Sequence, residues 1–354
     1  MSESCLITYQ VIKTHSQHHI GVASLNNTTR LNALNYQMVC DLKNKLLAWQ
    51  NDPKIVMVVI NSTIEKALCA GGDIRAIYQA KVNGEEVATA AYQYFSAEYQ
   101  MDYLIHKFQK PILVWGAGIV FGGGMGVLQG ASHRVVTPSS KLAMPELSIG
   151  LFPDVGATYF LNKLPGKTGL LLSMTGYLAN AADAIYLGLA DAYLGDEQFE
   201  PLLDMLANRA WQAESLKDHD ILDNALKTMQ NVRGKMVAAS LIAEHQSEID
   251  TLFAGQFKQV MSKLRKLPPW LADYQENVDN ASLISMAIAH YQQNFAKATL
   301  EQCLNWELKV ATHCAQYGDF MEGVRALLVD KDRTPNWRYK QLDEINTTTL
   351  SQFV

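Results

Sequence analysis

The feature that most constrains the fold of this chain is a stretch without charged side chains, from residue 111 to residue 132. A stretch of this length could cross a membrane as a helix. However, it holds seven glycines, which disfavour a continuous helix, and it begins with an apolar run typical of a buried strand. We therefore predict a buried strand, a glycine turn and a buried helix, and no membrane partner.

Strand and helix signals alternate through the first half of the chain. Asn35 is a suitable N-cap for a helix over residues 35–49, and a second helix over 86–108 ends at the Lys110-Pro111 step. The alternation predicts an α/β fold. Strands are predicted, from runs rich in Val and Ile, at residues 20–25, 55–60, 112–115 and 134–137.

The second half of the chain lacks strand signals. After about Asp196 the sequence favours amphipathic helices, such as those over residues 281–295 and 300–316. Pro268-Pro269 is typical of a turn between helices. We therefore divide the chain into a core over residues 1–195 and a helical C-terminal region over 196–354 that packs on the core.

Composition limits the classes of partner and the compartment. The net charge is -5, whereas sequence-independent binding of nucleic acid needs a dense positive surface, so we expect no nucleic-acid partner. The five cysteines are widely spaced, without a C-x-x-C pair, and no apolar signal segment is visible at the start. This pattern favours a reducing compartment, and we predict the cytoplasm.

Two glycine motifs each stand where a strand leads into a helix. Residues 69–73 (CAGGD) precede a predicted helix over 74–80, and residues 121–126 (FGGGMG) precede another. Backbone N–H groups at helix starts have no partner inside the helix, and two of them facing one point would form an oxyanion hole. Each motif alone is more typical of a tight turn. A dinucleotide site is the rival interpretation, but the glycine spacing does not match it.

Two carboxylates stand eight residues apart in a segment that contains two prolines. Glu146 and Asp154 could be solvated acids of a loop, and Glu98 could be a solvated charge on its helix. If Glu146 and Asp154 instead shared an apolar pocket, burial and mutual repulsion would separate their pKa values, so that one acts as base or nucleophile. His15, His18 and His19 have no acidic or cysteine partner at ligand spacing, and we predict no metal.

Together these segments resemble the crotonase superfamily, and in detail its 3-hydroxyisobutyryl-CoA hydrolase branch. The resemblance covers nearly the whole chain, although residues 196–317 contribute little to it. It rests on residues 31–35 (LNALN), 69–75 (CAGGDIR), 121–126 (FGGGMG), 143–146 (AMPE), 149–156 (IGLFPDVG) and 319–326 (DFMEGVRA), with Asp330, Lys331, Asp332 and Trp337.

The resemblance implies a crotonase fold, in which repeated β-β-α units form a superhelical core followed by a helical region. It implies catalytic roles for Glu146 and Asp154 and an oxyanion hole formed by Gly72 and Gly123. It also implies that Glu98, Gly123, Glu146 and Asp154 bind the substrate. No cofactor is expected, because coenzyme A is part of the acyl-CoA substrate.

Two positions distinguish hydrolysis from hydration. Hydratases of the superfamily use a glutamate where this chain has Gly126, and a glycine where it has Asp154. The branch resemblance therefore implies hydrolysis of a short branched 3-hydroxyacyl-CoA, 3-hydroxyisobutyryl-CoA, as in valine catabolism. An enoyl-CoA hydratase or isomerase is the alternative. Still open are 3-hydroxypropionyl-CoA as a substrate, the choice between nucleophile and base for Glu146, and assembly into a homo-oligomer.

Overall fold

The computed structural model describes residues 5–233 and 239–354, which form two compact units. Unit 1 takes in the chain up to Gly72, then Gln100–Leu142 and Ala179–Leu241. Unit 2 consists of Asp73–Tyr99, Ala143–Leu178 and Ile242–Val354. Each unit is therefore built from three separate stretches of the chain.

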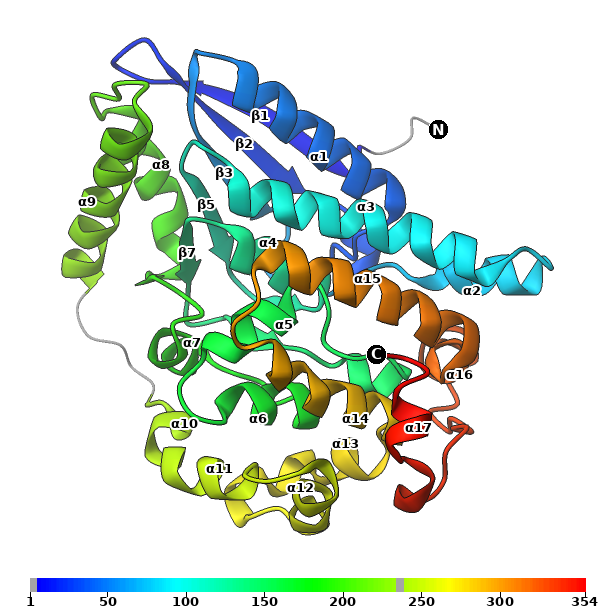
Figure 1. Cartoon of the computed structure of the whole chain (residues 1–354). Helices are drawn as coiled ribbons and strands as arrows, with labels where there is room; N and C mark the ends of the chain where they lie inside the picture. The colour runs from blue at the N-terminus through cyan, green and yellow to red at the C-terminus, as the bar shows by residue number, and fades with distance from the viewer. Residues whose placement is uncertain (1–4, 234–238) are drawn as a thin grey trace. The chain divides into compact units, whose positions relative to one another are not determined.

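The main sheet of unit 1 has six strands in the order β1-β2-β3-β5-β7-β9. The first two strands form an antiparallel hairpin, and the remaining neighbours are parallel (Figure 1). All four strands expected from the sequence are confirmed. The bounds are β1 (Ile7–Lys13), β2 (His19–Leu25), β3 (Ile55–Ser62), β5 (Ile112–Gly116), β7 (His133–Val136) and β9 (Ala192–Tyr193).

A second sheet of three short strands, ordered β4-β6-β8, accompanies the main sheet. Each of its strands follows a strand of the main sheet along the chain, so β3-β4, β5-β6 and β7-β8 are successive pairs, and the first two lead into helices. This is the repeated β-β-α arrangement that the resemblance implied. The bounds are β4 (Ala67–Cys69), β6 (Ile119–Phe121), β8 (Lys141–Ala143), α2 (Arg75–Val82) and α4 (Gly123–Gly130).

The uncharged stretch over residues 111–132 forms β5, β6 and α4; the first strand and the helix are as predicted, whereas β6 lies where only a turn was expected. Its glycines allow the sharp turns and close approaches that the arrangement requires. A Cβ atom added to Gly124 would lie 2.7 Å from the carbonyl oxygen of Cys69, so α4 begins directly against β4. Among the residues that the structure describes, no helix is long and apolar enough to cross a membrane.

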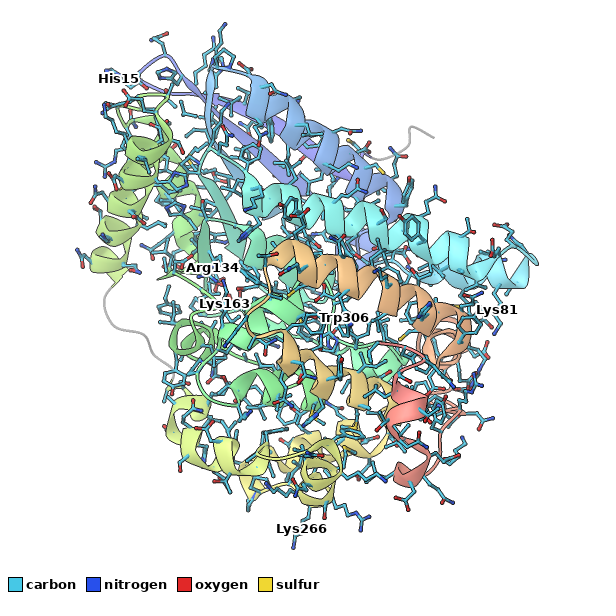
Figure 2. The ribbon with its side chains drawn as sticks, viewed as in Figure 1. His15, Lys81, Arg134, Lys163, Lys266 and Trp306 are labelled. Carbon is cyan, nitrogen blue, oxygen red and sulfur yellow. The ribbon has the colours of Figure 1, made fainter. Side chains whose placement is uncertain are left out.

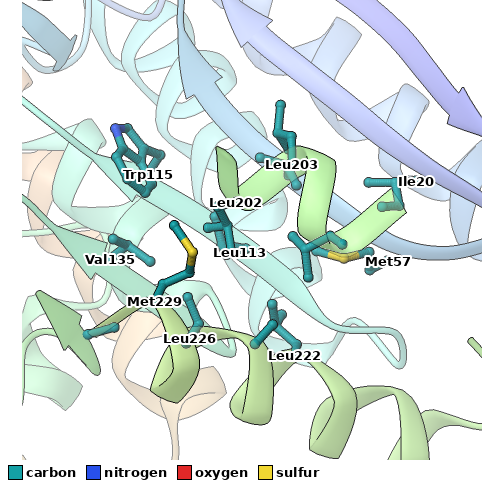
Figure 3. Packing of buried hydrophobic residues seen from close by; sticks show 14 of the residues in the cluster. Ile20, Met57, Leu113, Trp115, Val135, Leu202, Leu203, Leu222, Leu226 and Met229 are labelled. Atoms are coloured by element: carbon teal, nitrogen blue, oxygen red, sulfur yellow. The ribbon is translucent and has the colours of Figure 1, made fainter. Parts of the chain in front are cut away.

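Helices α1 (Tyr36–Asn51), α8 (Phe199–Ala207) and α9 (Ser215–Arg233) belong to unit 1. Asn35 caps α1 as predicted, because its side-chain oxygen accepts the N–H of Met38 at 2.8 Å. Leu202 and Leu226, from α8 and α9, pack with Met57, Leu113 and other sheet residues in one apolar cluster (Figure 3). The compact units therefore do not part at residue 195, where the predicted core ends.

Unit 2 is helical, and the described residues after Tyr193 contain no strand, as expected. The Pro268-Pro269 step lies between α12 and α13, again as predicted. The bounds are α3 (Val87–Lys107, which ends in unit 1), η2 (Glu146–Ile149), α5 (Ala157–Phe160), η3 (Leu161–Lys163), α6 (Thr168–Thr175), α11 (Gln246–Leu252), α12 (Phe257–Leu264), η5 (Pro269–Tyr274), α13 (Gln275–Asp279), α14 (Leu283–Tyr291), η6 (Gln292–Phe295), α15 (Leu300–Tyr317), α16 (Phe320–Val324), η7 (Arg325–Val329) and α17 (Thr347–Leu350).

We expect Gly323→Ala to lower the free energy of unfolding by about 1 to 3 kcal/mol, because an added methyl group overpacks the interior. The Cβ atom would overlap the carbonyl group of Ile149, so α16 and η2 must separate. Denaturation by urea measures the change, with Ser247→Ala, an exposed position of α11, as the control. An unchanged midpoint in Gly323→Ala would mean that the two backbones do not approach this closely.

Candidate functional site

The two predicted oxyanion-hole segments lie side by side within unit 1. Strand β4, which precedes Gly72, pairs in parallel with β6, which precedes Gly123. Gly123 is the first residue of α4, so its N–H lies at a helix start, where the dipole favours negative charge. The sequence-based pairing of Gly72 with Gly123 as donors to one oxygen stays a prediction.

Three acidic residues predicted from the sequence are buried in unit 2. Glu98 on α3, Glu146 at the start of η2 and Asp154 are 2%, 5% and 4% exposed. The interpretation of Glu146 and Asp154 as solvated loop acids is therefore wrong, and so is that of Glu98 as a solvated helix charge. The three acids lie close enough to interact electrostatically, because the charge of Asp154 acts on both Glu98 and Glu146.

Asp154 has a hydrogen-bond donor at its carboxylate. The hydroxyl of Tyr99 donates to its Oδ2 atom at 2.5 Å, a length typical of a charge-assisted bond. Burial raises the pKa of Asp154 to about 6, while the Tyr99 bond opposes the rise. The same burial, together with the negative charge of Asp154, raises the pKa of Tyr99 well above its ordinary value. Tyr99 therefore stays a donor.

Glu98 and Glu146 hold their protons more tightly than ordinary carboxyl groups. Burial, and next the charge of Asp154, raise the pKa of each well above its usual value. The Tyr94 hydroxyl, 3.3 Å from Glu98 Oε1, opposes the rise at Glu98. The Oε2 atom of Glu146 is buried and accepts no hydrogen bond in the structure. One oxygen of Glu146 is thus uncommitted to the protein.

The arrangement separates the carboxyl groups by acidity, as burial and repulsion predict. Asp154 loses its proton before Glu98 and Glu146 do, because the hydroxyl of Tyr99 donates to its carboxylate. Glu146 is the more basic group and, once ionised, is a strong base or nucleophile in a dry environment. The cluster can therefore supply one fixed negative charge and one reactive carboxylate.

Sequence reasoning missed three residues around Asp154, namely Tyr99, Gln292 and Glu307. Glu307 is fully buried and accepts the N–H groups of Gly156 at 2.7 Å and Thr158 at 2.8 Å. Burial raises the pKa of Glu307 to about 8, and these hydrogen bonds oppose the rise. A signal was present, because Glu307 lies on the apolar face of α15 with Leu304 and Ala311. An acid on such a face usually has a specific partner.

Three histidines and the cysteines are the remaining candidates from the sequence. His15, His18 and His19 stand at the mouth of the β1-β2 hairpin, where Figure 2 labels His15. Within residues 5–233 and 239–354, no group of three or more His, Cys, Asp or Glu side chains is placed to hold a metal ion. None of the five cysteines forms a disulfide bond.

Comparison with known proteins shows similarity along almost the entire chain. The sequence profile described as "Enoyl-CoA hydratase/isomerase" matches residues 20–354. The chain is 33% identical over 330 residues to a protein of Gallus gallus named "3-hydroxyisobutyryl-CoA hydrolase, mitochondrial". The match covers 92% of this chain and 84% of the relative.

Two solved structures resemble the whole fold. A structure titled as an enoyl-CoA hydratase from Rhodobacter sphaeroides has a TM-score of 0.85 and 28% identity. One titled as a carnitinyl-CoA dehydratase from Mycobacterium thermoresistibile has a TM-score of 0.85 and 31% identity. Both matches cover 99% of this chain and 97% of the other. They confirm the fold that the sequence resemblance implied.

We expect Tyr99→Phe to raise the pKa of Asp154 above about 6, since the lost hydrogen bond favours the ionised form. A larger fraction of Asp154 is then protonated at neutral pH. Titration of the aspartate carboxyl carbons by ¹³C NMR measures the shift, with Asp154→Asn to assign the signal. Tyr92→Phe, an exposed position on the same helix, is the matched control. An Asp154 titration curve identical in Tyr99→Phe and wild type would refute the pairing.

Proposed function

The chain belongs to the enoyl-CoA hydratase/isomerase family, and we propose that it hydrolyses 3-hydroxyisobutyryl-CoA to 3-hydroxyisobutyrate and coenzyme A. The observation that carries the proposal is the pair of buried carboxyl groups at Glu146 and Asp154, with glycine at position 126. A hydratase of the superfamily places its second acid at position 126. The names of the relatives at about 33% identity support hydrolysis.

In the proposed reaction the thioester carbonyl oxygen accepts hydrogen bonds from the N–H groups of Gly72 and Gly123. Negative charge develops on this oxygen as the carbonyl carbon becomes tetrahedral. Fixed backbone donors stabilise that charge without reorganisation, and loss of one such donor costs about 3 kcal/mol in the transition state. The helix start at Gly123 adds the favourable dipole of α4.

Glu146 either attacks the thioester itself or activates the water that attacks it. As nucleophile, its carboxylate forms a bond to the acyl carbon, the carbon–sulfur bond breaks, and water then hydrolyses the mixed anhydride. As general base, it takes a proton from the water that attacks the same carbon. Coenzyme A leaves as a thiolate in both routes, and because a thiol has a pKa of about 8.5 it needs little assistance. The unpartnered Oε2 atom of Glu146 supports both.

Asp154 and Glu98 would recognise the acyl group. We assign Asp154 as the acceptor of the substrate's 3-hydroxyl, and the donated hydrogen bond would weaken its negative charge. Because that charge raises the pKa of Glu146, substrate binding would make Glu146 easier to ionise. Glu98, which keeps its proton, would act as a donor to the same end of the substrate. No cofactor enters this scheme.

The second candidate is hydration or isomerisation of a short enoyl-CoA. The family match and the solved hydratase structure favour it. It lacks support from the acids of this chain, since Gly126 carries no side chain to serve as the second acid–base group.

Compartment and assembly are separate proposals. We keep the cytoplasm as the predicted compartment, because the five cysteines form no disulfide bond, although the name of the Gallus gallus relative places that protein in mitochondria. Turnover in valine catabolism follows from the proposed substrate alone. Assembly of several copies also stays a prediction.

We expect wild-type protein to release thiol from 3-hydroxyisobutyryl-CoA. Glu146→Gln should lower kcat by about 10²- to 10⁴-fold, because the reactive carboxylate is lost. Asp154→Asn should lower kcat/KM by about 10- to 100-fold through loss of a charged hydrogen bond. A thiol-trapping dye measures release, and Glu301→Gln, an exposed position of α15, is the control.

The same preparations should be tested with crotonyl-CoA, whose conjugated double bond absorbs light. No loss of this absorbance is expected. Rapid loss of the double bond without thiol release would replace the proposal by the hydratase alternative.

The two routes for Glu146 differ in their trappable intermediate. If Glu146 is the nucleophile, hydroxylamine added during turnover should capture the mixed anhydride as an acyl hydroxamate, with thiol release unchanged. Mass spectrometry of the products detects the hydroxamate, and Glu146→Gln shows the background reaction of hydroxylamine with the thioester. Hydroxamate no higher than this background would assign Glu146 as general base.

A further inference from the structure

The turn that carries Asp154, residues 153–158, has a strained backbone. Val155 has a φ of 55° and Gly156 a φ of 88°, so both lie in the left-handed region. Glycine adopts this region easily, but a β-branched residue does so only under strain. The strained residue follows Asp154 directly. Other groups must therefore hold this turn, which we call the Asp154 turn.

Two buried side chains from the C-terminal helices hold it. Glu307 on α15 accepts the N–H groups of Gly156 and Thr158, one at each carboxylate oxygen. Gln292 on η6 donates to the carbonyl of Pro153 at 2.6 Å and to the hydroxyl of Thr158 at 2.7 Å. Gln292 is 4% exposed and Glu307 is fully buried. Hydrogen bonds therefore hold the backbone on both sides of Val155.

Packing from the same helices reinforces these hydrogen bonds. The ring of Phe152, which precedes the Asp154 turn, lies edge-on to Trp306 of α15 at 5.6 Å between centroids; Figure 2 labels Trp306. A Cβ atom added to Gly156 would lie 3.1 Å from Leu300 on the same helix. The turn has little room to move on the side of α15.

We propose that Glu307 and Gln292 are positioning residues, which fix the Asp154 turn so that the Asp154 carboxylate meets Tyr99 and the 3-hydroxyl of the substrate. They do not touch the substrate themselves. This inference rests on the proposed function, because it takes the 3-hydroxyl as the group that Asp154 recognises. It assigns the C-terminal helical region a part in substrate discrimination.

A simpler explanation is that Glu307 only stabilises the start of α5, a helix of four residues. The two explanations differ in what a substitution changes. A residue that only stabilises affects every substrate alike, through the amount of folded protein. A residue that positions Asp154 affects substrates with a 3-hydroxyl more than those without one.

The test compares 3-hydroxyisobutyryl-CoA with isobutyryl-CoA, which lacks the hydroxyl. We expect Glu307→Gln to lower kcat/KM for the first by about 10- to 100-fold, since small displacements at a reacting centre have effects of this size. The loss for isobutyryl-CoA should be several-fold at most, so discrimination shrinks. Gln292→Leu should act in the same direction. Glu301→Gln on the same helix should change neither rate.

The double variant Val155→Gly/Glu307→Gln separates strain from position. Glycine adopts the left-handed conformation without strain, so thermal stability should recover relative to Glu307→Gln. Discrimination should not recover, because a glycine turn holds Asp154 less firmly. Joint recovery of stability and discrimination would overturn the proposal, as would equal losses for both substrates in Glu307→Gln.

Crystal structures of wild type and Glu307→Gln provide a readout that needs no turnover. The separation of Tyr99 Oη and Asp154 Oδ2, 2.5 Å in the wild type, should lengthen in the variant. An unchanged separation would overturn the inference. If wild type releases no thiol from either substrate, the proposed function fails, while this separation still tests the positioning role.

Discussion

The burial of several carboxyl groups in one helical unit governs the rest of this structure. Carboxylates removed from water require donors: Asp154 accepts the hydroxyl of Tyr99, Glu307 accepts two backbone N–H groups, and Glu98 accepts the hydroxyl of Tyr94 at a longer 3.3 Å. Glu98 and Glu146 instead retain their protons. The short bond from Tyr99 opposes the rise in the pKa of Asp154, so Asp154 ionises before Glu98 and Glu146. Acids that are all buried therefore differ in how tightly they hold their protons.

The main elements could be predicted from the sequence because their signals are local. Runs of Val and Ile gave the long parallel strands, and Asn35 marked the start of α1. Strands β4, β6 and β8 escaped prediction because three residues cannot show a periodicity. The boundaries of the compact units could not be predicted from the sequence for a different reason. Helices α8 and α9 cover the sheet of unit 1 although they follow it in sequence, and no local pattern records this packing.

The candidate site was predicted in part. Family resemblance, and not pattern, pointed to Glu146 and Asp154, since their own segment is also typical of an exposed loop. Their burial depends on helices far along the chain. The hydrogen bond from Gly156 to Glu307 joins residues 151 positions apart, so no local sequence pattern near Asp154 predicts it. The acid on the apolar face of α15 was a visible signal, but it indicated only that a partner exists.

The order of the chain gives the discontinuous units a consequence for synthesis on the ribosome. The last residue of unit 1 is Leu241, whereas unit 2 needs the chain up to Val354. Domains fold as they emerge, N-terminal parts first. The growing chain can therefore complete its glycine-rich sheet unit before Glu307 is synthesised. At that stage Asp154 has been synthesised but is still exposed to solvent. The buried surroundings that raise the pKa values of these acids form only once Glu307 and its helix have been synthesised, so the sheet unit of a nascent chain can fold before the acids reach their final environment.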